Sequence, residues 1–235
     1  MASARVLGAG ALLAAGALGV GLAYLWRRVL RPPEEGAAAF EFDPDLVAYF
    51  EAAGWRAYYD RNWPRLLWLM VRLCQEQFRI PFPVSLLAAS YAARAARAWV
   101  PLDHDERVVR HYYERFYRLA RRYSGLRFDP ARAAALELAY NDIHRRLVGN
   151  PDKAEFIETM VALHSAVFGI APEQARESAE LRVAAANAVD RITSRTSTDV
   201  EGDWAQVEDD LRRCYRALQR ELRARDGHPA RAPSE

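Results

Sequence analysis

Helix start signals recur along this chain from residue 43 to residue 199, separated by apolar segments of similar length. Most are Asp or Asn residues, or a proline, placed just ahead of such a segment: Asp43-Pro44, Asn62 before Pro64, Asp103 with Glu106, Asp129-Pro130, Asn150-Pro151, Pro172 and Thr198-Asp199. Side chains of this kind accept hydrogen bonds from the free amides of a first helical turn, and proline is tolerated there. Gly125, Gly149 and Gly169 stand where helix ends are expected. This punctuation predicts about eight helices joined by short loops.

Between these signals, apolar residues recur at the three- and four-residue spacing of a helix face. One such stripe is formed by Leu66, Leu69, Met70, Leu73 and Cys74. No segment shows the convincing alternation of a β-strand. Hydrophobic residues make up 51% of the chain and charged residues 27%, which is typical of a folded protein. We therefore predict an all-α domain over residues 42–225.

Two sets of matching segments suggest that this domain has two related halves. Phe42-Asp43-Pro44 recurs as Phe128-Asp129-Pro130, and the spacing of Leu73, Phe78 and Ile80 recurs in Leu163, Phe168 and Ile170. The repeat would divide the bundle into two four-helix units, residues 42–125 and 128–225. Common helix-start sequences and frequent Leu and Phe could produce the same matches without duplication, so both interpretations stay open.

The N-terminal region carries an uncharged segment from Val6 to Trp26, about the 20 residues that a helix needs to cross a bilayer core. A cleaved signal peptide is the alternative, but the segment is long for a signal core and is followed directly by Arg27 and Arg28. We predict a single transmembrane helix within an anchor region of residues 1–33. The arginines on its C-terminal side favour a cytoplasmic location for the rest of the chain. Residues 34–41 are predicted to be a linker and 226–235 a disordered tail.

Charge and cysteine content exclude several classes of protein. Thirty-three Lys and Arg residues against 31 Asp and Glu residues give a net charge of +2, too balanced for a protein that neutralises many phosphates. Nucleic acid is therefore excluded as an expected partner. Cys74 and Cys214 form no CxxC or metal-finger spacing, and no P-loop, HExxH or nucleophile elbow occurs.

Two histidines lie on predicted helix faces where they could bind a ligand. His144 shares a half-polar face with Glu137 and Asn141, at spacings of three and four residues. His164 lies on an apolar stripe with Met160 and Phe168, where a hydrogen-bonded core histidine is the commoner explanation. Aromatic residues are dense between Tyr49 and Trp68, which indicates core packing or the wall of an apolar ligand site.

One segment resembles a known family. Asn141-Asp142-Ile143-His144, followed by Asn150, Asp152 and Phe156, is similar to the Asn-x-x-His motif and downstream helix start of the ER-bound oxygenase mpaB and rubber oxygenase family. The run RAARAWVP from Arg94 to Pro101 is similar to the arginine-containing segment of that family, although its Arg-Thr pair is absent. The resemblance implies an all-helical fold that holds haem b. It places His144 at the haem iron, with Asn141 in its motif and Arg94 or Arg97 near a propionate or bound oxygen.

Two functions follow from these observations as alternatives. The first is a membrane-anchored, haem-dependent oxygenase that acts on an apolar substrate, with His144 or His164 as the axial ligand of the haem. The second is a non-catalytic, membrane-tethered helical module that binds a protein partner or a lipid through its aromatic-rich first two helices. The sequence sets neither the substrate nor the oligomeric state.

Overall fold

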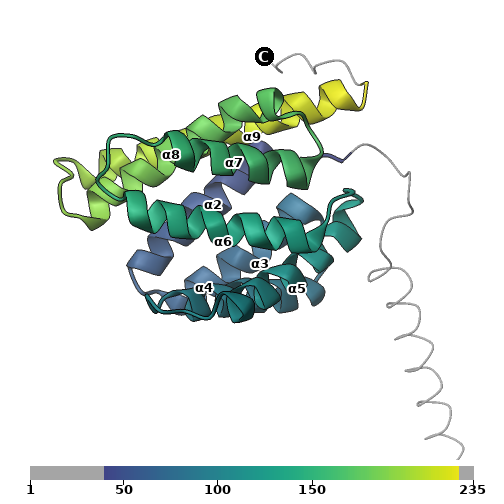
Figure 1. Ribbon diagram of the computed structural model, residues 1–235, viewed down its shortest axis with the longest axis horizontal. Coiled ribbons are helices and arrows are strands. Elements are labelled where there is room, and N and C mark those ends of the chain that lie inside the picture. Colours follow the sequence, from purple (N-terminus) through teal and green to yellow (C-terminus); the bar gives the residue numbers. More distant parts are fainter. Residues whose placement is uncertain (1–39, 228–235) are drawn as a thin grey trace, which may run out of the picture. The chain divides into compact units, whose positions relative to one another are not determined.

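The computed structural model describes residues 40–227, and within this range it contains eight α-helices and no β-strand (Figure 1). The helices are α2 (Pro44–Tyr59), α3 (Trp63–Phe78), α4 (Val84–Trp99), α5 (Glu106–Ser124), α6 (Pro130–Leu147), α7 (Ala154–Phe168), α8 (Pro172–Thr193) and α9 (Val200–Arg225). The prediction of an all-α bundle of about eight helices is confirmed.

Each helix packs against the next one along the chain, and the last helix returns to the first. α9 lies against both α8 and α2, while α7 lies between α6 and α8 (Figure 1). The predicted boundary between two halves falls in the turn between α5 and α6, with four helices on either side. Because α2 packs on α9, the two predicted units share one core, and their duplication stays a prediction.

Most helix starts lie where the sequence predicts them. The Asp43 carboxylate accepts hydrogen bonds from the amides of Asp45 and Leu46, and Asp129 accepts one from the amide of Ala131 at 2.9 Å. Asn62 and Asp199 cap α3 and α9 in the same way. These contacts satisfy first-turn amides that have no partner within the helix.

Two helices start later in the chain than predicted, and the start of a third helix was not predicted. α5 is capped by Asp105 instead of Asp103, and α7 begins at Ala154, four residues after Asn150. Asn150 and Asp152 instead cap successive turns of the loop, with Asp152 accepting from the amide of Ala154 at 2.9 Å. α4 follows Pro83, which offers no side-chain cap for a sequence pattern to detect.

The main core begins earlier in the chain than predicted. Its largest fully buried side chains include Phe156, Ile80 and Met160, and a smaller cluster of Phe50, Ala57 and Leu69 lies between α2 and α3. Phe40 lies in the segment predicted to be linker, yet its ring is buried and lies 5.8 Å from that of Phe42. The folded domain therefore includes the end of that segment.

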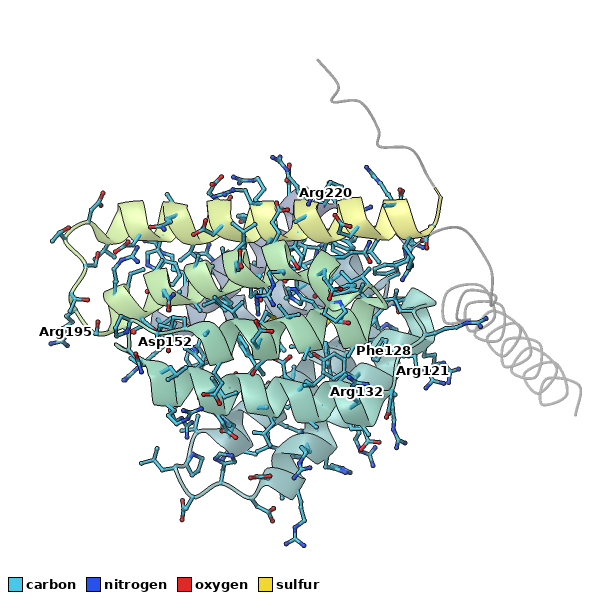
Figure 2. All side chains as sticks on the ribbon, turned by 45° about the horizontal axis from the view of Figure 1, so that its top comes forward. Arg121, Phe128, Arg132, Asp152, Arg195 and Arg220 are labelled. Atoms are coloured by element: carbon cyan, nitrogen blue, oxygen red, sulfur yellow. The ribbon has the colours of Figure 1, made fainter. Side chains whose placement is uncertain are left out.

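The predicted membrane helix, residues 6–26, lies outside the described residues, as does the tail from residue 228. Among residues 40–227, none of the helices combines the length and the apolar character required to cross a membrane. Charged side chains cover the outside of the bundle: Arg195 lies at one end, Arg121 and Arg132 at the other, and Arg220 on the outer side of α9 (Figure 2).

Candidate functional site

A pocket of about 720 Å³ lies between α2, α3 and α4. Its wall is almost entirely apolar or aromatic, and Glu51 and Arg97 are its charged residues. The other lining residues are Phe50, Gly54, Trp55, Tyr58, Trp63, Leu66, Met70, Leu73, Ala93, Ala96 and Val100. We call this space the outer pocket.

The outer pocket exists because small residues stand where three helices meet. Gly54 of α2 faces Leu66 of α3, and a Cβ atom at Gly54 would lie 4.0 Å from the Leu66 Cδ1 atom. Ala93 and Ala96 form the α4 side of the pocket. Large aromatic side chains on α2 and α3 then form walls around space that these short side chains leave unfilled.

A second, smaller space of about 180 Å³ lies deeper in the bundle, and we call it the inner cavity. Glu51 and Leu73 line both spaces, so these two side chains form the wall between them. The inner cavity is also lined by Glu137, His164 and Arg182. The lining of the inner cavity is thus mixed, because these ionisable side chains stand among residues such as Phe78, Phe116 and Met160.

A buried ion pair forms the centre of this wall. Glu51 of α2 is only 7% exposed, and its carboxylate pairs with the Arg182 guanidinium of α8. The Tyr215 hydroxyl of α9 donates to the other carboxylate oxygen. The guanidinium also lies 4.9 Å from the Trp55 ring, which lines the outer pocket. Three helices are thus joined by one charged cluster.

Glu137 adds a second buried carboxyl group to the inner cavity. It accepts a hydrogen bond from the Tyr117 hydroxyl at 2.8 Å. Burial raises the pKa of Glu137 above its usual range, and the Tyr117 bond and the positive charge of Arg182 oppose that rise. Burial also raises the pKa of Tyr117, so this phenol stays protonated and donates.

His164 is a neutral histidine in the inner cavity wall. It is 6% exposed, and its Nδ1 atom lies 2.8 Å from the Ser178 hydroxyl oxygen. Ser178 donates its own proton to the Ala175 carbonyl oxygen, so His164 must be the donor in the first bond. Burial, aided by the charge of Arg182, lowers the pKa of His164 to about 3.

His144 lies away from both spaces. Its Nε2 atom donates to the Asp190 carboxylate of α8 at 2.9 Å, and its ring stacks on Phe156 with a centroid distance of 5.0 Å. Asn141 donates to the Tyr113 hydroxyl at 3.0 Å and to the Glu137 carbonyl oxygen. These contacts hold α6 against α5 and α8. The His144 Nε2 atom and the Asn141 side-chain amide nitrogen, which the predicted haem site would use, therefore already have hydrogen-bond partners within the protein.

Of the two arginines predicted to lie near the haem, one lines a pocket and the other does not. Arg97 lines the outer pocket, whereas Arg94 lies on the surface of α4 near the Tyr112 ring, 6.0 Å from its centroid. Of the five residues predicted from the sequence, Arg97 therefore reaches the outer pocket and His164 reaches the inner cavity, whereas His144, Asn141 and Arg94 line neither.

Glu51 and Arg182 were not predicted as site residues, although the sequence around each of them contains a signal. Glu51 follows Val47 and Ala48 on the apolar stripe of α2, and Arg182 shares a buried stripe with Ser178 and Val189 on α8. A charged residue on an apolar stripe requires a partner inside the fold. The pattern alone does not identify that partner, because 131 residues separate Glu51 from Arg182.

As these residues are placed, they do not fit a histidine-ligated haem. The outer pocket is lined by no histidine, and the inner cavity, which His164 lines, is smaller than the about 300 Å³ at which pockets for drug-sized ligands begin. Among residues 40–227 no group of three or more His, Cys, Asp or Glu side chains is arranged to hold a metal ion.

Comparison of the chain with protein-family models, with curated proteins and with solved structures finds no match in any of the three. The resemblance of residues 141–156 to the mpaB family therefore stays a prediction.

Proposed function

We propose that this protein is a membrane-associated helical module that binds the acyl chain of an anionic amphiphile in the outer pocket. The observation that carries the proposal is the apolar space of about 720 Å³ between α2, α3 and α4. Pockets that enclose small molecules span about 300–1,000 Å³ and have mainly hydrophobic and aromatic walls. The outer pocket has both properties.

The energy of such binding comes from burying methylene groups. Each buried methylene contributes about 0.8 kcal/mol, so ten contribute about 8 kcal/mol. Association itself costs about 4–15 kcal/mol, which offsets most of that gain for a short chain. Long acyl chains should therefore bind and short ones should not.

The charged residues of the pocket indicate how such a ligand would lie. Arg97 is exposed, and among the described residues it has no ion-pair partner. Glu51 stands at the inner wall, but Arg182 and Tyr215 already neutralise and bind its carboxylate. Arg97 is therefore the charged residue that a carboxylate or phosphate head group would meet, with the acyl chain directed inward along the apolar wall.

Filling the outer pocket tests this proposal. Ala96 is exposed on α4 and lines the pocket, so Ala96→Trp should place an indole in the pocket without disturbing the core. We expect this change to weaken binding of a pyrene-labelled 16-carbon fatty acid at least tenfold, the equivalent of about 1.4 kcal/mol. Fluorescence titration of the full chain in a non-ionic detergent measures the effect.

The matched control is Ala205→Trp, which adds the same indole at an exposed site on α9. This variant should bind the fatty acid like the unchanged protein, and both variants should melt within a few degrees of it. Equal affinity of the Ala96→Trp variant and the unchanged protein would show that the outer pocket is not the binding site.

A further inference from the structure

Several apolar side chains at and beside the outer pocket are exposed on the protein surface. Three of the pocket's lining residues are strongly exposed: Tyr58 by 41%, Trp63 by 55% and Val100 by 56%. Leu102, in the loop that follows Val100, is exposed by 86%. We call these four residues, together with Arg97, the mouth. Its aromatic and aliphatic side chains form a surface that water solvates poorly.

Charge is distributed unevenly around this mouth. Residues 58–103, which run from Tyr58 of the mouth to the residue after Leu102, contain six arginines (Arg61, Arg65, Arg72, Arg79, Arg94 and Arg97) against three acidic residues, Asp60, Glu76 and Asp103. The whole chain, in contrast, has a net charge of only +2. This segment therefore carries an excess of positive charge within a nearly neutral protein.

The arginines of other helices are mostly neutralised by partners. Arg56 pairs with Glu201, Arg146 with Glu155 and Arg176 with Glu158. Within residues 40–227, Arg61 and Arg65 have no such partner, and neither has Arg97 at the mouth. These unpaired positive charges are available to an anionic surface.

We propose that the mouth docks on an anionic phospholipid bilayer, so that an acyl chain passes from the bilayer directly into the outer pocket. This inference rests on the proposed function and adds where the ligand comes from. Trp and Tyr favour the boundary between head groups and acyl chains, Val and Leu enter the apolar layer, and arginine side chains reach back to the phosphates. The mouth and its surroundings combine all three kinds of residue.

A bilayer fits these residues better than a protein partner does. Basic residues gain from the negative potential of a membrane surface whichever lipid they meet, whereas a protein partner would have to place acidic groups opposite separate arginines. The pocket also opens at the mouth, where a docked bilayer would supply the ligand that the outer pocket is proposed to bind.

A fluorescent label at the mouth tests the docking. Val100→Cys in the full chain, labelled with nitrobenzoxadiazole and reconstituted in vesicles, should brighten at least twofold when phosphatidylserine replaces 30% of the phosphatidylcholine. Lipids with a doxyl group on the acyl chain should quench it. The native Cys74 and Cys214 are buried, and burial raises the pKa of both thiols, so the label reacts at the introduced site.

Two matched variants sharpen the test. Ala205→Cys on α9 carries the same label on a different helix and should respond to neither lipid. Arg61→Gln combined with Arg65→Gln, in the Val100→Cys protein, should remove more than half of the brightening because the attraction to phosphatidylserine is lost. Equal responses at residues 100 and 205 would overturn the proposal. So would a signal at residue 100 that rises with protein density in neutral vesicles, which would indicate a second copy of the chain.

The test separates this inference from the proposed function. Docking without binding of the pyrene-labelled fatty acid would leave the membrane contact standing and refute the ligand site. Fatty-acid binding in detergent without a response of the label at residue 100 would do the reverse. The Ala96→Trp variant should still dock, because it blocks the pocket and leaves Trp63, Val100 and Leu102 in place.

Discussion

Replacing Arg182 by methionine is expected to lower the free energy of unfolding by about 3–5 kcal/mol, the cost of leaving one partner of a buried ion pair without the other. Arg182 pairs with the Glu51 carboxylate, lies over the Trp55 ring and lines the inner cavity. Its loss leaves a carboxylate that is 7% exposed without its counter-charge. Thermal unfolding should shift downward by about 6–20 °C, at about 2–4 °C for each kcal/mol.

A second change at the same site distinguishes a lost charge from lost packing. Combining Arg182→Met with Glu51→Leu removes both charges and should recover much of the lost stability, because apolar residues often replace a buried ion pair at little cost. Arg176→Met serves as the control, since Arg176 pairs with Glu158 on the surface and should change stability by less than about 1 kcal/mol. A double variant as unstable as Arg182→Met alone would show that the charge pair is not the cause.

Acid is expected to destabilise the fold through His164. The pKa of this buried imidazole falls to about 3, against about 6.5 in an unfolded chain. Below pH 6.5 the unfolded state therefore binds a proton that the folded state does not, so stability is fully present above pH 6.5 and declines toward pH 3. By pH 4.5 the loss from this one group is about 2–3 kcal/mol.

Comparison with His164→Asn isolates this contribution. An asparagine amide can donate to Ser178 in place of Nδ1, but it does not ionise. Glu137 titrates in both proteins, and its raised pKa acts in the opposite direction, so it cancels in the difference. Urea unfolding between pH 7 and pH 4.5 should show the difference in stability between the two proteins change by about 2–3 kcal/mol. A constant difference would mean that His164 is protonated, or exposed, in the folded state.

The fold was largely predictable because most helix starts depend on residues that are close to one another in the sequence. Asp43, Asn62, Asp129 and Asp199 each accept hydrogen bonds from amides within three residues, so a pattern of neighbouring residues suffices to find them. The start of α4 was missed because Pro83 provides no capping side chain. Asp103 and Glu106 have the spacing of a capping box, which predicts a start at Asp103, but Asp105 is the residue that accepts the hydrogen bond from a first-turn amide, that of Arg107.

The candidate site was much less predictable because its members meet only in the folded chain. The aromatic residues from Tyr49 to Trp68 indicated an apolar ligand wall, and several of them line the outer pocket. The wall between that pocket and the inner cavity could not be predicted, because Glu51 contacts Arg182 and Tyr215, which lie on helices distant in sequence. His144 shows the same limit: its spacing places it on a polar face, but its partner, Asp190, lies 46 residues away.

The lipid that the full-length protein carries after purification in a mild detergent shows whether the outer pocket holds an acyl chain. Lipid extraction followed by mass spectrometry should find about one anionic acyl lipid per protein molecule, and the Ala96→Trp variant should lose most of it while the Ala205→Trp variant keeps it. An absorption spectrum of the same sample tests the haem hypothesis. A Soret band that His144→Ala abolishes, or equal amounts of lipid in both Trp variants, would overturn the proposed binding of an acyl chain in the outer pocket.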